Sequence, residues 1–177
     1  QMRLVNEIGR DITGILEVEA LVAQVCHRLE GAFGYYHAQL GLIAGGGKVG
    51  FHLAEELLRE HHEVLVIERE SARAAQVREE LGGNVMVGDS CEATTLDAAG
   101  VSRADLVAAV TGDDEDNLVI CDIAHYRGVG RTIARINNPK NEEIFRLLGI
   151  DSTVSSTDLI LSVIEQEIPE QALVPLL

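Results

Sequence analysis

Short apolar runs alternate with amphipathic segments along most of the chain. The apolar runs span residues 42–44, 64–67, 84–87, 106–110, 131–136 and 152–154. Between and after them, apolar positions recur at helical spacing in residues 49–60, 71–81, 94–99, 114–126, 142–148 and 157–166. Such short runs are typical of strands buried on both faces. The pattern predicts an α/β fold, a Rossmann-like doubly wound parallel sheet of about six strands with helices on both faces.

Two of the predicted helices carry further expectations. Ser71 is placed to cap helix 71–81, since a serine side chain can accept a hydrogen bond from the first turn. Helix 157–166 has an apolar face and no remaining strand to cover, so we expect it to cross to a second subunit. Ligands of such sheets bind beyond the carboxyl ends of the strands, where the candidate site residues are therefore sought.

The first predicted strand opens directly into a glycine-rich turn. Gly45, Gly47 and Gly50 have the G-x-G-x-x-G spacing, and the next strand ends on Glu68, eighteen residues after Gly50. Strand, glycine turn, helix, strand and terminal acid together form the dinucleotide-binding fingerprint. The helix N-terminus offers free N–H groups to a pyrophosphate, and Glu68 can accept hydrogen bonds from ribose hydroxyls. The alternative is a turn that only packs a helix on the sheet.

The first forty residues have a different character. Leu4, Ile8, Ile12 and Ile15 recur at helical spacing, and so do Leu21, Val22, Val25 and Leu29. This pattern predicts one or two amphipathic helices. We expect residues 1–38 to form a helical extension that precedes the sheet and is not part of the nucleotide-binding core.

Composition and charge narrow the function classes. The chain has 177 residues, of which 46% are hydrophobic and 24% charged, as in a soluble globular domain. The net charge of −15 argues against a nucleic-acid partner, which needs a basic face. The longest apolar runs are too short to span a membrane, and the N-terminus lacks the pattern of a signal peptide. Cys26, Cys91 and Cys121 are odd in number and far apart, which indicates a reducing compartment and no metal cage.

Several motifs, in order, resemble one family. The runs A-G-G-G-K-V-G, H-E-V-L-V-I-E, G-D-S, V-T-G-D-D-E-D-N and I-A-R-I-N-N-P are similar to those of the Trk-type potassium-uptake regulators. The resemblance is to the N-terminal, nucleotide-binding half of an RCK domain (regulator of potassium conductance). It places the Rossmann-like domain at residues 39–168 and makes 169–177 the start of a linker to a second lobe.

The resemblance implies a regulatory role. Such a protein is a cytoplasmic subunit that binds NAD(H) or ATP/ADP and gates a potassium transporter or channel. It is a homodimer, in some cases a ring of dimers, and lies at the inner face of the membrane through its partner, without inserting into the bilayer. The transported ion, the partner, the direction of gating and the ring size are not written in the sequence.

The resemblance also carries roles to single residues. Gly45, Gly47 and Gly50 match the phosphate loop, Glu68 the ribose-binding acid, and Asp89 the acid beside the adenine. Thr111 and Asn117 match a turn beside the phosphates or the distal nucleoside, and Arg135 matches an arginine that reaches phosphates from a neighbouring subunit. The full set of candidate cofactor-binding residues is Gly45, Gly46, Gly47, Lys48, Val49, Gly50, Glu68, Arg69, Asp89, Ser90, Cys91, Thr111, Gly112, Asn117 and Arg135.

The chain departs from the family pattern at two positions. His61 stands where a glycine usually ends the helix, so it must adopt a left-handed conformation or the helix must end differently. Glu68 is one methylene longer than the usual aspartate, which changes its reach toward a ribose. Residues 1–43 also resemble, weakly, the start of a GAF domain, although a GAF pocket needs a further sheet. The alternative is a helical extension used for packing or self-association.

The sequence allows more than one interpretation of several residues. The cluster Asp113, Asp114, Glu115 and Asp116 suits either a divalent cation or a helix N-cap with first-turn acids. Lys48 is a phosphate contact or a solvated loop residue, and Asp89 faces the cleft or forms a turn. Arg135 binds phosphate or makes a structural ion pair.

The competing functions are also kept in view. A carboxylate at Glu68 repels a 2′-phosphate, so NADP is disfavoured despite Arg69, whereas NAD, ATP and ADP are not separated. The rival reading is an NAD-dependent oxidoreductase fragment without its substrate domain. It is disfavoured because no Tyr-x-x-x-Lys pair is present, and we expect no enzyme activity. A third reading is a scaffold with a vestigial site.

Overall fold

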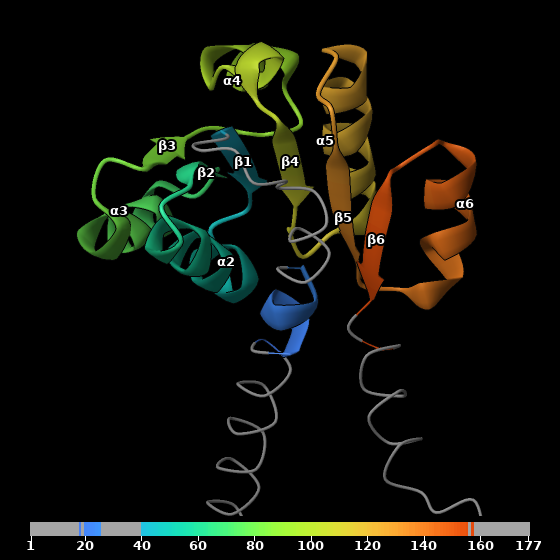
Figure 1. Ribbon diagram of the computed structural model, residues 1–177, viewed down its shortest axis with the longest axis horizontal. Coiled ribbons are helices and arrows are strands. Elements are labelled where there is room, and N and C mark those ends of the chain that lie inside the picture. The colour runs from blue at the N-terminus through green and yellow to red at the C-terminus, as the bar shows by residue number, and fades with distance from the viewer. Residues whose placement is uncertain (1–17, 19, 26–39, 156, 158–177) are drawn as a thin grey trace, which may run out of the picture.

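A computed structural model of the protein describes residues 18, 20–25, 40–155 and 157 (Figure 1). Its centre is one sheet of six parallel strands in the order β3-β2-β1-β4-β5-β6. The strands are β1 (Leu40–Ala44), β2 (Glu63–Glu68), β3 (Val85–Val87), β4 (Leu106–Ala109), β5 (Thr132–Ile136) and β6 (Ser152–Ser155). The expected Rossmann-like, doubly wound parallel sheet is confirmed.

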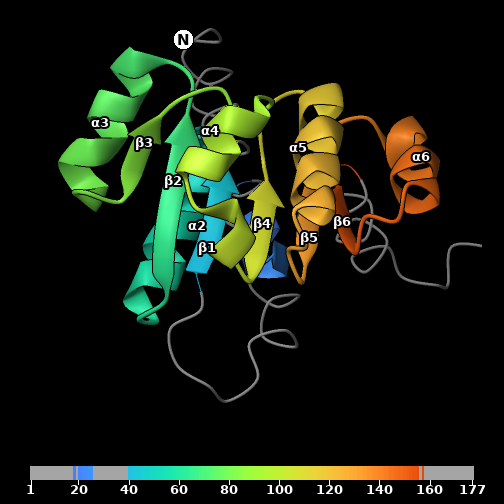
Figure 2. The same cartoon turned by 90° about the horizontal axis from the view of Figure 1, so that it is seen from above.

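The helices cover both faces of the sheet. They are α2 (Lys48–Arg59), α3 (Ser71–Leu81), α4 (Ala93–Ala98), α5 (Asp114–Tyr126) and α6 (Glu142–Leu147). In Figure 2, α4 and α5 lie in front of the sheet and α2 lies behind it. The apolar side chains of α2 and α3 share one core cluster, and those of α4, α5 and α6 share another. From β1 the chain builds one half of the sheet toward β3, and from β4 it builds the other half toward β6. The topological switch point therefore lies between β1 and β4, where a crevice opens at the carboxyl ends of the strands.

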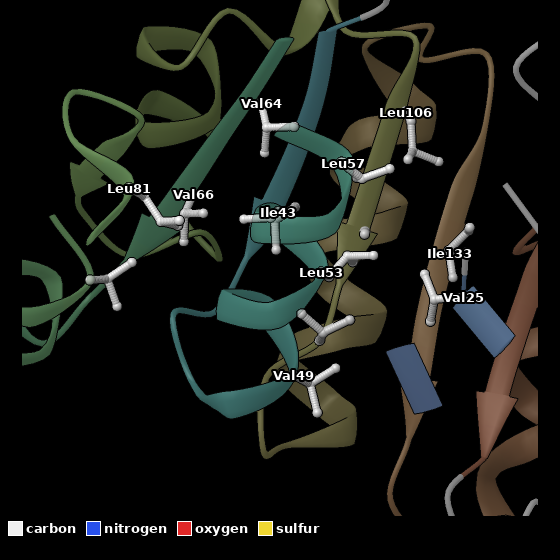
Figure 3. Packing of buried hydrophobic residues seen from close by; sticks show 14 of the residues in the cluster. Val25, Ile43, Val49, Leu53, Leu57, Val64, Val66, Leu81, Leu106 and Ile133 are labelled. Carbon is white, nitrogen blue, oxygen red and sulfur yellow. The ribbon is translucent and has the colours of Figure 1, made fainter. Parts of the chain in front are cut away.

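The first core cluster explains why α2 packs so closely on the sheet. Leu53 and Leu57 of α2 are at most 1% exposed and lie against Ile43 of β1, as Figure 3 shows. Leu21 and Val25, from the helical residues 20–25, belong to the same cluster. The expectation that the N-terminal extension forms no part of the core was therefore wrong at these residues. Both side chains are at most 2% exposed and share this cluster with Ile133 of β5 and Val154 of β6.

The element ends agree with the sequence patterns to within two residues. The short 3₁₀ turns Val101–Arg103 and Pro139–Asn141 were not predicted. Ser71 is the first residue of α3 and not its cap: Glu70 is the N-cap, and no described side chain bonds the first turn there. The parts of the extension and of helix 157–166 that lie in residues 1–17, 19, 26–39, 156 and 158–177 are outside the described residues.

His61 ends α2 in the left-handed conformation that its position demands, with a φ of 68°. Its N–H donates to the Leu58 carbonyl at 3.0 Å, and the His62 N–H donates to the Leu57 carbonyl at 3.0 Å. These two bonds form a Schellman motif, which normally uses glycine. The first of the two alternatives for His61 is therefore confirmed.

Gly50 is where the turn and α2 come closest. A Cβ at this position would overlap the Gly45 carbonyl oxygen and would lie 3.3 Å from Cγ2 of Ile43. Because both neighbours belong to the buried strand and its turn, neither can move away cheaply.

We therefore expect Gly50→Ala to lower the free energy of unfolding by about 1–3 kcal/mol, as overpacking of a tight core does. Gly47→Ala is the matched control: its φ is −70° and no described atom lies within 4 Å of an added Cβ. At that N-cap the same change should cost about 0.5 kcal/mol. Urea denaturation followed by circular dichroism measures both, and equal losses would contradict this account of Gly50.

Candidate functional site

A cavity of about 90 Å³ lies at the carboxyl ends of β1, β2, β3 and β4. Eight of the candidate residues from the sequence line it: Gly45, Gly47, Glu68, Arg69, Asp89, Ser90, Cys91 and Thr111. Five further residues complete its wall: Ile67, Arg73, Gly88, Asp116 and Ile120. Of these, the sequence had singled out only Asp116, as part of the acidic cluster. The cavity therefore collects residues from four separate turns at the crevice that the topology predicts.

The glycine turn forms the floor of the cavity. Gly45 has a φ of 107°, and its N–H donates to the Ile67 carbonyl of β2 at 2.9 Å. A Cβ at Gly45 would lie 3.2 Å from the Thr111 backbone, so the turn passes close to the end of β4. In α2, which begins at Lys48, no described side chain caps the first turn and no acidic residue lies in it. Its first N–H groups are therefore left to bind a ligand or water.

Glu68 joins the glycine turn to the second strand. Its side chain is 5% exposed, and its Oε2 accepts a hydrogen bond of 2.7 Å from the Gly46 N–H. Its Oε1 accepts one of 2.8 Å from the Glu70 N–H. Each carboxylate oxygen has a second lone pair, so both can still accept a hydrogen bond from a ligand. Glu68 thus holds the turn in addition to facing the cavity, a role that the sequence did not predict.

The acidic cluster works mainly as a helix start. The Asp113 Oδ1 caps α5 by accepting from the Asp116 N–H at 3.1 Å. Asp116 faces the cavity, whereas Asp114 turns away from it. Among the residues that the structure describes, no group of three or more acids, histidines or cysteines could hold a metal ion. The geometry favours the capping interpretation over the cation site.

Asp114 fastens α5 to the segment that follows β5. The carboxylate accepts hydrogen bonds from the Asn137 N–H at 2.6 Å, the Asn138 N–H at 3.0 Å and the amide groups of Asn137 and Asn141 at 2.9 and 2.8 Å. Burial acts to raise the pKa of Asp114, but these four donors outweigh it and hold the pKa below its ordinary value of 3.8.

Asn117 ties three elements together behind the cavity. It is fully buried, and its Oδ1 accepts from the Thr111 N–H at 2.9 Å and from the Thr111 hydroxyl at 2.7 Å. Its Nδ2 donates to the Arg135 carbonyl oxygen at 2.9 Å. Thr111 lines the cavity, but Asn117 and Arg135 do not. Asn117 therefore positions Thr111 and the end of β5, while Arg135 contributes its backbone here.

The far wall of the cavity is the turn after β3. The Asp89 Oδ1 accepts from the Cys91 N–H at 2.9 Å, so Asp89 both shapes this turn and lines the cavity. The Cys91 Sγ lies 3.8 Å from the Asp116 carbonyl oxygen, to which it donates. Burial, together with the carboxylates of Asp116 and Asp89, raises the pKa of Cys91 to about 12. Cys91 is therefore a neutral thiol and a weakly polar wall, not a nucleophile.

The remaining candidates lie beside the cavity or behind it. Gly46 and Lys48 line a second cavity of about 290 Å³ between α2 and α3, which shares Gly47 and Arg73 with the first. Val49, Gly50, Gly112, Asn117 and Arg135 line neither. Arg73 could have been sought from the sequence, because it lies in the first turn of α3, the helix that follows β2. The approach of Asp116 to Arg69, 47 residues away, has no local signal.

Comparison with known proteins identifies what this arrangement is similar to. Residues 42–156 match the model of the TrkA-N domain. A Trk system potassium uptake protein TrkA homolog from Methanothermobacter thermautotrophicus is 40% identical over 114 residues, 64% of this chain and 53% of that protein. The Trk system potassium uptake protein TrkA of Mycobacterium tuberculosis is 35% identical over 130 residues, 71% of this chain and 58% of that protein. The chain thus matches little more than half the length of these relatives.

Solved structures share the fold. The TrkA-N domain of the inner membrane protein ybaL from Escherichia coli has a TM-score of 0.68 at 20% identity, over 75% of this chain and 98% of that one. The GsuK channel bound to NAD has a TM-score of 0.63 at 25% identity, over 74% and 23% of the two chains. GsuK bound to ADP has a TM-score of 0.61 at 25% identity, over 72% and 33%.

We expect Asp114→Ala to lower the free energy of unfolding at pH 7 by about 2–4 kcal/mol, because two backbone donors lose their charged acceptor. The pKa of Asp114 is lower in the folded protein than in the unfolded chain. Its stabilisation is therefore complete above the unfolded value near 3.8 and is lost as pH falls through the folded pKa. The difference from the parent should be smaller at pH 3 than at pH 7, as measured by urea denaturation.

The matched control is Glu115→Ala, which removes an exposed acid from the same turn of α5. It should change the free energy of unfolding by less than about 0.5 kcal/mol. A similar loss in both variants would show that the bonds of Asp114 carry no special stability.

Proposed function

The chain belongs to the TrkA-N domain family, and on that basis we propose that it is the nucleotide-sensing part of a regulator of potassium transport. In this proposal the cleft binds NAD(H) or ATP/ADP, and the bound state is passed to a membrane potassium transporter or channel. The module acts at the cytoplasmic face of the membrane through this partner, as a homodimer or a ring of dimers, and it catalyses no reaction.

The observation that carries the proposal is the pairing of an uncapped helix start with a buried carboxylate at one crevice. The α2 N-terminus can bind phosphate oxygens through its free N–H groups and the positive end of its dipole. Glu68 is held in place by two backbone donors and keeps lone pairs for the two ribose hydroxyls. A nucleotide is the ligand class that needs both groups together.

The charge of Glu68 also bears on the choice of nucleotide. A carboxylate at the end of β2 repels a 2′-phosphate but accepts from a free ribose diol, so NADP should bind more weakly than NAD, ATP or ADP. The relatives give support: solved structures of GsuK have been obtained with NAD and with ADP. Arg73, 4.0 Å from the Glu68 Oε2, and Arg69 add positive charge to the wall of the cleft.

Regulation requires that the ligand favour one conformation or assembly over another, because only a difference in binding energy shifts an equilibrium. Exposed apolar side chains on α5, on α6 and at the C-cap of α6 support contact with a second subunit: Val119, Tyr126, Ile144, Leu147 and Leu148. The crossing of helix 157–166 to that subunit stays a prediction. No helix in the described part of the chain is long and apolar enough to cross a membrane.

Isothermal titration calorimetry of the chain with NADH, NAD, ATP, ADP and NADP tests the proposal. We expect saturable binding of at least one adenine nucleotide, with NADP weakest. Glu68→Gln should weaken binding by roughly tenfold or more, because an amide replaces a charged acceptor of the ribose hydroxyls.

Glu70→Gln is the matched control, since it removes the same charge two residues away. The exposed Glu70 side chain pairs with Arg73 at 3.2 Å, and only its backbone contacts Glu68. The affinity of the Glu70→Gln variant for each nucleotide should stay within roughly twofold of that of the parent. Failure of every nucleotide to bind the folded parent chain would reject the sensor proposal and leave the glycine turn as a packing device.

A further inference from the structure

Arg69 and Asp116 form an ion pair across the cavity. Arg69 follows Glu68 at the end of β2, and Asp116 lies in the first turn of α5. The Arg69 Nη1 donates to the Asp116 Oδ2 at 3.2 Å, and both residues line the cavity wall. Their side chains are 67% and 30% exposed, so the pair lies at the solvent side of the cavity and joins two elements that are remote in sequence.

The space behind this pair is too small for a nucleoside. The cavity holds about 90 Å³, whereas small-molecule sites usually start at roughly 300 Å³. The buried part of its wall cannot yield, because Ile67, Glu68 and Ile120 are at most 5% exposed and belong to the packed core or its hydrogen bonds. The exposed Arg69–Asp116 ion pair can open at little cost, since surface pairs contribute little to stability.

We propose that the Arg69–Asp116 ion pair closes the nucleoside end of the cleft in the unliganded protein and that an adenine nucleotide must displace it. This inference rests on the proposed function. The released Arg69 guanidinium can then bind the face of the base or a phosphate, both of which attract a cation. The negative charge of Asp116 does not attract an anionic ligand. Asp116 instead competes with the nucleotide for Arg69 and thereby lowers the affinity of the site for the nucleotide.

The surroundings of Asp116 allow its charge to be removed without disturbing the backbone. Its N–H donates to the Asp113 Oδ1, and its carbonyl oxygen accepts from the Cys91 Sγ. Both contacts use main-chain atoms, so Asp116→Asn leaves the start of α5 and the wall at Cys91 in place. The change removes the charge that pairs with Arg69. It also removes one of the two carboxylates that raise the pKa of Cys91, whose neutral thiol carries no charge that would be altered.

Calorimetric titration of the chain with ADP provides the test. Asp116→Asn should bind ADP roughly two- to fivefold more tightly than the parent, the range expected for loss of one exposed ion pair. Glu115→Gln is the matched control, because it removes the same charge from the same turn at an exposed position. In an Arg69→Gln background the gain from Asp116→Asn should disappear, because no pair remains to be broken.

A neutral probe separates closure from general repulsion of phosphate. Adenosine carries no charge, so added salt should affect its binding mainly by screening the ion pair. In NMR titrations, raising the NaCl concentration should tighten adenosine binding to the parent more than to Asp116→Asn.

The outcomes separate the two proposals. Unchanged or weaker ADP binding by Asp116→Asn, while the parent binds, would overturn the closure and leave the nucleotide site intact. An equal gain from Glu115→Gln, or a gain that survives in the Arg69→Gln background, would also overturn it. Failure of both the parent and Asp116→Asn to bind ADP or any of the other four nucleotides would instead overturn the proposed function.

Discussion

The hydrogen bond from the Gly46 N–H to the buried carboxylate of Glu68 holds the turn between β1 and α2 against the end of β2. It is a charge-assisted bond of 2.7 Å to a buried carboxylate, which makes it stronger than an ordinary backbone contact. An added Cβ at Gly46 would lie 3.0 Å from the Glu68 Cβ and Oε2, so a side chain there would have to push Glu68 aside. The position of the α2 N-terminus, and with it any phosphate site, follows from this contact.

A protein with a net charge of −15 must still offer an anion a favourable site. It does so by engaging the carboxylates around the cavity before a ligand arrives. Glu68 and Asp89 accept from backbone N–H groups, and Asp116 pairs with Arg69. Each negative charge is thus partly compensated locally, while the start of α2 keeps its donors free. Local geometry, not overall charge, decides what the crevice can bind.

The features that the sequence predicted well are those fixed by neighbours along the chain. The glycine spacing, the acid at Glu68 and the apolar runs depend on local steric rules. For His61 the sequence left two alternatives open, a left-handed conformation or a different helix end, and the structure has the first. The partners of Asp114, Asn117 and Asp116 could not be predicted, because each contact joins strands or helices whose order only the topology sets. Ser71 was misread for a different reason: the helix starts one residue earlier than a serine cap requires.

The hydrogen bonds of Asp114 to the residues after β5 connect the movement of α5 to that of the sheet edge. The first turn of α5 carries both Asp116, which lines the cavity, and Asp114, which bonds to residues 137–141. Residues 137–141 are followed in the chain by α6 and then by the edge strand β6. Because Asp114 makes four hydrogen bonds to this segment, the first turn of α5 and residues 137–141 are held firmly together. A small rotation of the first turn of α5 would therefore also shift residues 137–141 and, through α6, the edge strand β6.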